Sequence, residues 1–198
     1  MSAPATGPEA TYQDVLDAPE HLVAEVLDGE LILSPWPAIL HAQVSSLLGI
    51  DVGGPFHRKP GDPGGPGGWI ILDEPELHLG RHILVPDLAG WRRERMPWLP
   101  KAAFLTLAPD WACEILSPSS VRVDRIRKPR IYAGEGVAWL WLVDPEQHTL
   151  EVLRLVEGAW TLHQAFEGEE KLRADPFAAV ELDPGRWWFE EPPAAEVP

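Results

Sequence analysis

Apolar positions along the chain fall mostly into short runs of the kind that form strands. The predicted strands are 69–79, 83–91, 111–116, 138–144, 149–156 and 159–166. The run at 138–144 is almost wholly apolar, which is typical of a strand that is buried on both faces. Turn residues at 80–82 and at Glu157–Gly158 predict that the first two runs and the last two runs form antiparallel hairpins.

Further elements are predicted near the amino terminus. Residues 11–16 are expected to form a short helix, and Glu25–Leu33 to form a hairpin about the turn pair Asp28–Gly29. Apolar residues recur at close to helical spacing from 38 to 48, which predicts a helix of about three turns. These elements precede the strand-rich part of the chain.

Residues 53–68 are dominated by glycine and proline. We expect neither a helix nor a strand in this segment, which indicates a loop or a flap. The segment is not typical of a phosphate-binding loop. No Gly-Lys-Ser/Thr follows it, and its prolines lack the backbone donors that such a loop needs.

A basic segment of helical length follows the third predicted strand. Serines at 117–120 suit the start of a helix, and Gly134 or Gly136 suits its end, so we predict a helix over 119–134. Pro129 lies inside this segment, and we therefore expect either a kink or two short helices.

The length and composition indicate one globular domain, over residues 11–189. The chain has 198 residues, of which 45% are hydrophobic and 24% charged. Both ends, 1–10 and 190–198, are rich in Pro, Ala and Glu, and we expect them to be poorly ordered tails. No apolar run is long enough to span a bilayer, and the first residues lack a signal-peptide pattern. We therefore expect a cytoplasmic protein with no membrane partner.

The chain has one cysteine, Cys113. A single cysteine excludes an internal disulfide and a cysteine-based zinc cluster. We expect Cys113 to be a small buried side chain rather than a nucleophile, because free cysteine is among the most buried residue types.

The formal net charge of −15 argues against binding to nucleic acid, which is carried by Lys and Arg. The basic residues are nevertheless clustered in two places. One cluster is Arg122, Arg125, Arg127, Lys128 and Arg130, and the other is Arg92, Arg93, Arg95 and Lys101. On charge alone, a solvated face is the better explanation for each cluster.

Two acidic residues lie inside apolar strand-like runs. Asp87 belongs to the run ILVPDL and Glu114 to the run WACEIL, so both carboxylates are expected near the interior of a sheet, where an unpaired charge is costly. A hard divalent cation such as Mg²⁺ binds carboxylate oxygens, waters and substrate phosphates. The alternative is that Asp87 caps a strand end beside Pro86 and that Glu114 pairs with an arginine.

The order of these motifs resembles the PD-(D/E)XK nuclease superfamily, and within it most closely the Uma-type family of restriction-endonuclease-like proteins. The resemblance covers roughly residues 11–165. The segments that carry it are AEVLDGELILSP (24–35), His41, VPDLAGWRRER (85–95), APDWACEILSPSS (108–120), DRIRKPRIYAGEGVAWLWLVDP (124–145) and TLEVLRL (149–155). It implies a restriction-endonuclease-like α/β (α+β) fold, in which helices flank a mixed central sheet, with accessory hairpins at both ends of the chain.

The resemblance also implies a set of site residues. Asp87 and Glu114 would bind Mg²⁺ or Mn²⁺, and the carbonyl of Ile115 would be a further ligand. The superfamily motif places a lysine two residues after the glutamate, where this chain has Leu116. The resemblance implies that Lys128 replaces it from the next helix, with Tyr132 on the same helix face.

Several accessory residues are less closely tied to the site. Glu74 or Pro75 is expected opposite Asp87, depending on the register, and Glu74 is equally well explained as a solvated charge. Glu25 and Glu30 match acidic positions of the family, yet nothing in the sequence places them in the site. His41 would contact a phosphate or a carboxylate ligand, although a lone histidine at a helix start is more often structural.

The function that this resemblance implies is a Mg²⁺-dependent endodeoxyribonuclease. DNA would be the partner, bound through Arg122, Arg125, Arg127 and Arg130. One alternative is a catalytically inactive nuclease fold that binds or regulates, which the net charge and Leu116 favour. Another is a small-molecule hydrolase or a structural partner protein. The adjacent Trp187 and Trp188 are a candidate contact for a homodimer.

Overall fold

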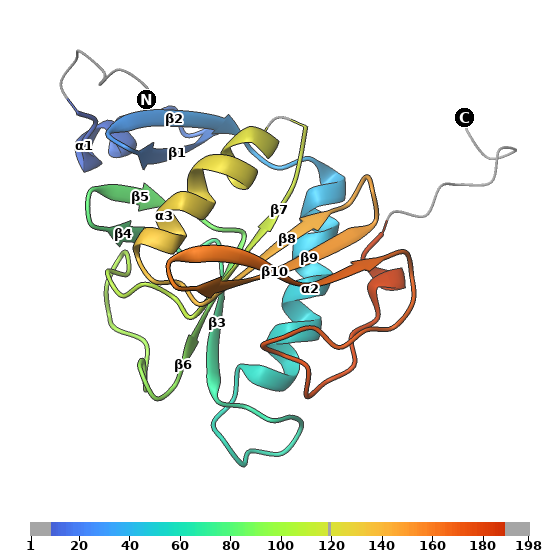
Figure 1. Ribbon diagram of the computed structural model, residues 1–198. Coiled ribbons are helices and arrows are strands. Elements are labelled where there is room, and N and C mark those ends of the chain that lie inside the picture. Colours follow the sequence, from blue (N-terminus) through green and yellow to red (C-terminus); the bar gives the residue numbers. More distant parts are fainter. Residues whose placement is uncertain (1–8, 119, 189–198) are drawn as a thin grey trace, which may run out of the picture.

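A six-stranded sheet forms the centre of the protein in the computed structural model, which describes residues 9–118 and 120–188 (Figure 1). The strand order is β10-β9-β8-β7-β6-β3. The strands are β3 (Trp69–Asp73), β6 (Leu88–Arg92), β7 (Trp111–Ile115), β8 (Trp139–Asp144), β9 (Thr149–Val156) and β10 (Ala159–Glu167). Only the β7–β8 pair is parallel among the described strands. The central sheet is therefore mixed, as predicted.

A second sheet has four strands in the order β2-β1-β5-β4. Its strands are β1 (Leu22–Leu27), β2 (Glu30–Pro35), β4 (Leu77–Leu79) and β5 (His82–Leu84). The predicted hairpin about Asp28–Gly29 is confirmed as β1–β2, and both turn residues have positive φ, which suits the tight turns of hairpins. The predicted carboxyl-terminal hairpin is also confirmed, as β9–β10, but it extends the central sheet.

The predicted runs 69–79 and 83–91 pair as expected, but each run is divided between the two sheets. β3 pairs with β6 in the central sheet, and β4 pairs with β5 in the smaller sheet. Pro75 and Pro86 lie at the two interruptions, where proline removes a ladder hydrogen bond. The Glu74 amide donates to the Asp87 carbonyl, so Glu74 lies opposite Asp87. Asp87 thereby lies where the chain passes from one sheet to the other.

The helices are α1 (Tyr12–Leu16), α2 (Ile39–Phe56), the π-helix η1 (Val123–Arg127), α3 (Lys128–Gly134) and the 3₁₀ helix η2 (Pro184–Arg186). The prediction that 53–68 holds no helix is wrong for its first four residues, because α2 continues through Pro55 to Phe56. Phe56 is buried and its ring centroid lies 4.8 Å from that of Phe177. Tertiary packing therefore outweighs the poor helix propensity of this segment.

The predicted basic helix consists of two helical pieces, one of the two arrangements expected. In η1 the turn is wide, and the Lys128 amide donates to the Val123 carbonyl. α3 then begins with Pro129 in its first turn, where the missing N–H is tolerated. Ser119, at the predicted start, lies outside the described residues.

Both faces of the central sheet are covered. Side chains of α2 pack on one face with Trp111, Trp141 and Phe177, and α3 packs on the other face with strands of the smaller sheet (Figure 1). β8 is buried on both faces, as predicted. Trp187 and Trp188 also belong to the core, so they do not provide the surface contact proposed for a dimer.

The described part of the chain contains no helix of the length and hydropathy needed to cross a membrane. The predicted tails, 1–10 and 190–198, lie outside the described residues except for Glu9 and Ala10.

Candidate active site

Asp87 directly precedes β6, beside the end of β7. Because Leu88 pairs with Cys113 in the antiparallel ladder, Asp87 comes next to the Glu114–Ile115 end of β7. The Ile115 amide donates to Asp87 Oδ2 at 2.6 Å, and His41 Nε2 lies 3.1 Å from Asp87 Oδ1. Both oxygens of Asp87 are therefore held in place, one by a strand backbone and one by the first turn of α2.

Glu114 is a carboxylate inside the protein, with its side chain 1% exposed. Lys128 Nζ lies 3.1 Å from Glu114 Oε2, and the Tyr132 hydroxyl donates to Glu114 Oε1. Lys128 and Tyr132 are four residues apart on α3, so they share one helix face. The structure thus brings together Glu114, Lys128 and Tyr132, three of the residues that the sequence resemblance implies.

Four oxygen atoms surround the ammonium group of Lys128. They are Glu25 Oε1 and Glu114 Oε2, each at 3.1 Å, the Val85 carbonyl oxygen at 3.2 Å and Asp124 Oδ1 at 3.4 Å. The ammonium group donates hydrogen bonds to Glu114 and to the Val85 carbonyl, and it forms ion pairs with Glu25 and Asp124. Glu25 lies on β1 and Glu114 on β7, so Lys128 contacts both sheets.

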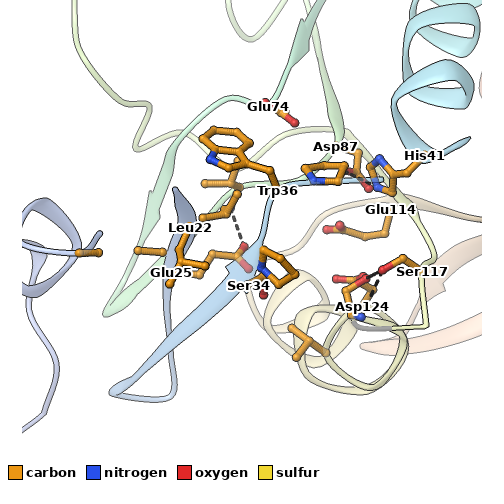
Figure 2. Close-up of a pocket in the computed structure, with 18 of the residues that line it drawn as sticks. Leu22, Glu25, Ser34, Trp36, His41, Glu74, Asp87, Glu114, Ser117 and Asp124 are labelled. Carbon is orange, nitrogen blue, oxygen red and sulfur yellow. Dashed lines mark hydrogen bonds and ion pairs between the residues drawn. The ribbon is translucent and has the colours of Figure 1, made fainter. Parts of the chain in front are cut away.

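These groups face a cavity of about 610 Å³ (Figure 2). Its carboxylates are Glu20, Glu25, Glu74, Glu76, Asp87, Glu114 and Asp124, while Lys128 and His41 are its basic side chains. Seven carboxylates against one lysine and one histidine make the cavity strongly acidic. Apolar side chains, among them Leu22 and Trp36, form the rest of its wall.

The acidic surroundings change the protonation of the buried groups. Burial raises the pKa of Glu114 well above the usual carboxyl value; Lys128 opposes this shift, and the charges of Asp124, Asp87 and Glu25 add to it. Burial alone would lower the pKa of Lys128, but the negative charges of Glu114, Glu25 and Asp124 outweigh it and hold that pKa well above its usual value. Lys128 is therefore charged, and Glu114 takes up a proton more readily than an exposed glutamate.

His41 is governed by the same balance. Burial would lower its pKa, but the hydrogen bond to Asp87 and the negative charges nearby raise the pKa above its usual value. Among the described residues, its buried Nδ1 atom has no hydrogen-bond partner. The ring therefore contacts Asp87 through its other nitrogen, Nε2.

The carboxylate oxygens of Asp87 and Glu114 suit a hard divalent cation that the protein would coordinate only in part. No three His, Cys, Asp or Glu side chains of the described residues form a metal-holding group, so an all-protein cage is absent there. Mg²⁺ needs no such cage, since it is bound through one or two carboxylates, waters and substrate phosphates. Asp87 and Glu114 supply two carboxylates, and each oxygen accepts more than one bond. The excess of negative charge in the cavity favours the same kind of ion.

Comparison with known proteins identifies the family. The Uma2 family, described as "Putative restriction endonuclease", matches residues 10–185. The chain belongs to the Uma2 family.

A solved structure supports the same fold. It is described as a "putative nuclease belonging to DUF820" from Anabaena variabilis ATCC 29413. It superposes with a TM-score of 0.71 at 22% sequence identity, over 90% of this chain and 97% of that one. No curated protein matches the chain. At this identity the likeness shows the fold, and the resemblance to restriction-endonuclease-like proteins is confirmed by the Uma2 match.

The accessory residues of this Uma2 protein are divided between the cavity and the surface. Glu25, Glu74 and His41 line the cavity. Glu30 does not, because it is exposed and pairs with Arg127 at 2.9 Å. Burial raises the pKa of Glu74, and the charges of Asp73 and Asp87 add to the effect. Ile115 is fixed next to Asp87 by its amide, and ligation by its carbonyl stays a prediction.

The arginines predicted to bind nucleic acid have different surroundings. Arg125 pairs with Glu151 at 2.9 Å, and Arg127 donates to Glu30 and to the Leu27 carbonyl. Arg122 and Arg130 are exposed. Two of the four side chains are thus occupied within the protein.

Sequence reasoning did not identify two residues of the cavity, Asp124 and Trp36. Asp124 is the single acid of the basic segment and lies four residues before Lys128, a spacing that signals contact on a helix. Trp36 is flanked by Pro35 and Pro37. No signal in the sequence tied this residue to the acids.

Proposed function

We propose that this protein is a metal-dependent endonuclease that hydrolyses phosphodiester bonds in DNA. The supporting observation is that Asp87, just before β6, Glu114 on β7 and Lys128 on α3 all line one cavity. Membership of the Uma2 family points to the same reaction class. The Anabaena structure, described as a nuclease, has the same fold.

Asp87 and Glu114 would hold the cation, with the Ile115 carbonyl as a further ligand. A divalent cation bound there would polarise a phosphoryl oxygen and lower the pKa of a water. The chain fixes both carboxylates before any ligand arrives. Asp87 is held by the Ile115 amide and His41, and Glu114 by Tyr132 and Lys128. Such preorganisation is a main source of catalytic stabilisation.

Lys128 would supply the positive charge that the superfamily motif takes from its strand lysine. Leu116, in that strand position, is 4% exposed and packs in the core. Lys128 contacts Glu114 from α3 instead and offsets negative charge that accumulates near the phosphate. Its contact with Glu114 also favours the ionised form of that carboxylate.

A cleavage assay tests this proposal. Supercoiled plasmid and single-stranded DNA are incubated with Mn²⁺ or Mg²⁺ and with wild type, Asp87→Asn, Glu114→Gln or Lys128→Met. Glu30→Gln is the matched control, because it makes the same chemical change on an exposed glutamate outside the cavity. We expect cleavage to fall by about 100-fold or more in the three site variants and to be retained in the control. Equal cleavage by Glu114→Gln and Glu30→Gln would refute the assignment.

A second candidate function is a nuclease fold that binds without cleaving. The observation that favours it is the arrangement around Lys128, whose ammonium group already has four protein oxygen atoms within 3.4 Å. Calorimetric titration with Mn²⁺, read together with the cleavage assay, distinguishes an endonuclease from a module that binds metal without cleaving. Carboxylate-dependent metal binding without cleavage of any substrate supports the binding module, and absence of metal binding refutes the endonuclease.

A further inference from the structure

One side of the cavity mouth is apolar and carries an exposed tryptophan. Trp36 lies between β2 and α2 and is 54% exposed, although it lines the cavity. Figure 2 shows its indole on the side of the cavity where Glu74 and Asp87 lie, with Leu22 close by. This apolar wall and the candidate active site therefore share one space.

One hydrogen bond and two neighbouring prolines restrict the position of Trp36. Its indole Nε1 donates to the Glu20 carbonyl at 3.3 Å, and prolines on both sides restrict its backbone. Within the described residues, no aromatic ring stacks on it. A half-exposed indole on which no other ring stacks offers a surface for a planar group.

The charge of the cavity limits what can bind there. Seven carboxylates face it, so a polyanion gains little from electrostatic attraction beyond Lys128, His41 and a bound cation. Stacking of a nucleobase on an aromatic ring does not depend on that attraction. Affinity for a nucleotide would therefore come mainly from its base, and Trp36 is the one Phe, Tyr or Trp side chain among the described residues that line the cavity.

The size and depth of the site favour one strand over two. A cavity of about 610 Å³ lies in the range that encloses a ligand of nucleotide size. The Glu114 and Lys128 side chains are 1% and 6% exposed, so a phosphate must enter the protein to approach them. A base-paired nucleotide keeps its base inside the double helix, where it cannot reach Trp36.

From this geometry we propose that Trp36 stacks on the base of an unpaired nucleotide beside the scissile phosphate. The substrate class is single-stranded nucleic acid or an unpaired segment within a duplex. Leu22 and Pro35 complete the apolar side of this base-binding wall. The proposal rests on the proposed nuclease function and narrows its substrate.

Binding measurements with Ca²⁺ in place of Mg²⁺ test the stacking separately from cleavage. Fluorescently labelled 12-nucleotide single-stranded DNA, single-stranded RNA and blunt duplex DNA are titrated with the full chain, and anisotropy gives the affinities. We expect single strands to bind at least tenfold more tightly than the duplex. Trp36→Ala should weaken single-strand binding by about tenfold, and Trp36→Phe should restore most of it. Trp98→Ala is the matched control, because Trp98 is 76% exposed and does not line the cavity.

The outcomes separate this inference from the proposed function. Equal DNA and RNA binding supports recognition of the base alone, and a preference for one of them adds recognition of the sugar. Duplex binding as tight as single-strand binding, no detectable binding, or equal effects of Trp36→Ala and Trp98→Ala overturns the base-stacking role. If single strands bind through Trp36 but no substrate is cleaved, the stacking inference stands and the endonuclease proposal fails.

Discussion

His41 Nε2 lies 3.1 Å from Asp87 Oδ1, joining the first turn of α2 to the residue that precedes β6. The pair is almost wholly buried, with side chains 9% and 15% exposed. The interaction raises the pKa of His41 in the folded protein, against the effect of burial.

The His41–Asp87 pair should stabilise the fold in a pH-dependent way. Because the folded pKa of His41 lies above the unfolded value of about 6.5, the contribution is fully present below that pH and is lost as pH rises through the folded pKa. The free energy of unfolding is measured in urea, with EDTA present to remove metal ions, from about pH 5.5 to 8.5. The loss of this free energy in His41→Gln should shrink as pH rises.

His82 provides a control with the opposite sign. Burial lowers its pKa, so its contribution is present above the unfolded pKa and is lost as pH falls. The stability lost in His82→Gln should therefore grow as pH rises. The same trend in both variants would contradict the assignment for His41.

Metal binding should release a proton from Glu114. The pKa of Glu114 is raised by burial, so protons compete with a cation for this carboxylate at higher pH than they would at an exposed glutamate. We expect Mn²⁺ affinity to increase with pH beyond the ordinary carboxyl range. In calorimetry the binding enthalpy should vary with the ionisation enthalpy of the buffer. Glu30→Gln should keep this dependence and Glu114→Gln should lose it; an enthalpy that ignores the buffer argues against this coupling.

Removing Lys128 should destabilise the protein strongly. Lys128→Met leaves Glu25, Glu114 and Asp124 buried without their shared cation. We expect a loss of about 3 kcal/mol in the free energy of unfolding, measured in urea at neutral pH. Lys101 is exposed, and Lys101→Met should change that free energy by less than about 0.5 kcal/mol. Equal stability of the two variants would show that the buried carboxylates are neutral rather than paired.

Two glycine-to-alanine substitutions should have opposite effects. A Cβ on Gly90 would lie 2.9 Å from Ile71 Cδ1 and 3.1 Å from the Trp111 ring, so overpacking should cost about 1–3 kcal/mol. Gly54 lies within α2, and a Cβ there meets nothing within 4 Å. Gly54→Ala should stabilise the protein by about 0.5–1 kcal/mol. Thermal unfolding of both variants measures the two effects. A lower unfolding temperature in Gly54→Ala, as in Gly90→Ala, would be inconsistent with a helical conformation at the end of α2.

Much of the fold follows from local patterns in the sequence. The hairpin at Asp28–Gly29, the buried strand at 138–144 and the pairing of β9 with β10 were all predictable, because turn chemistry and strand periodicity act over a few residues. The family resemblance added Asp87 and Glu114 as joint candidates for the site.

The features that were not predictable depend on contacts between distant segments. The end of α2 depends on Phe56 packing against Phe177. The division of the paired runs at Glu74 and Asp87 depends on the presence of a second sheet. Trp36 lies near the acids because the β2–α2 connection lines the same cavity. Periodicity describes which face of an element is apolar, but it does not say which element covers that face.

Lys128 contacts Glu25 in the smaller sheet and Glu114 in the central sheet. The same side chain therefore supplies the positive charge at the candidate site and connects the two sheets. The smaller sheet also carries the hairpin that leads to Trp36. The charge that Lys128 brings to the site and its contact with both sheets therefore cannot be changed independently. A substitution that removes this charge would also weaken the contact between the two sheets that places Trp36 near the carboxylates, so the proposed cleavage and the proposed base stacking would be lost together.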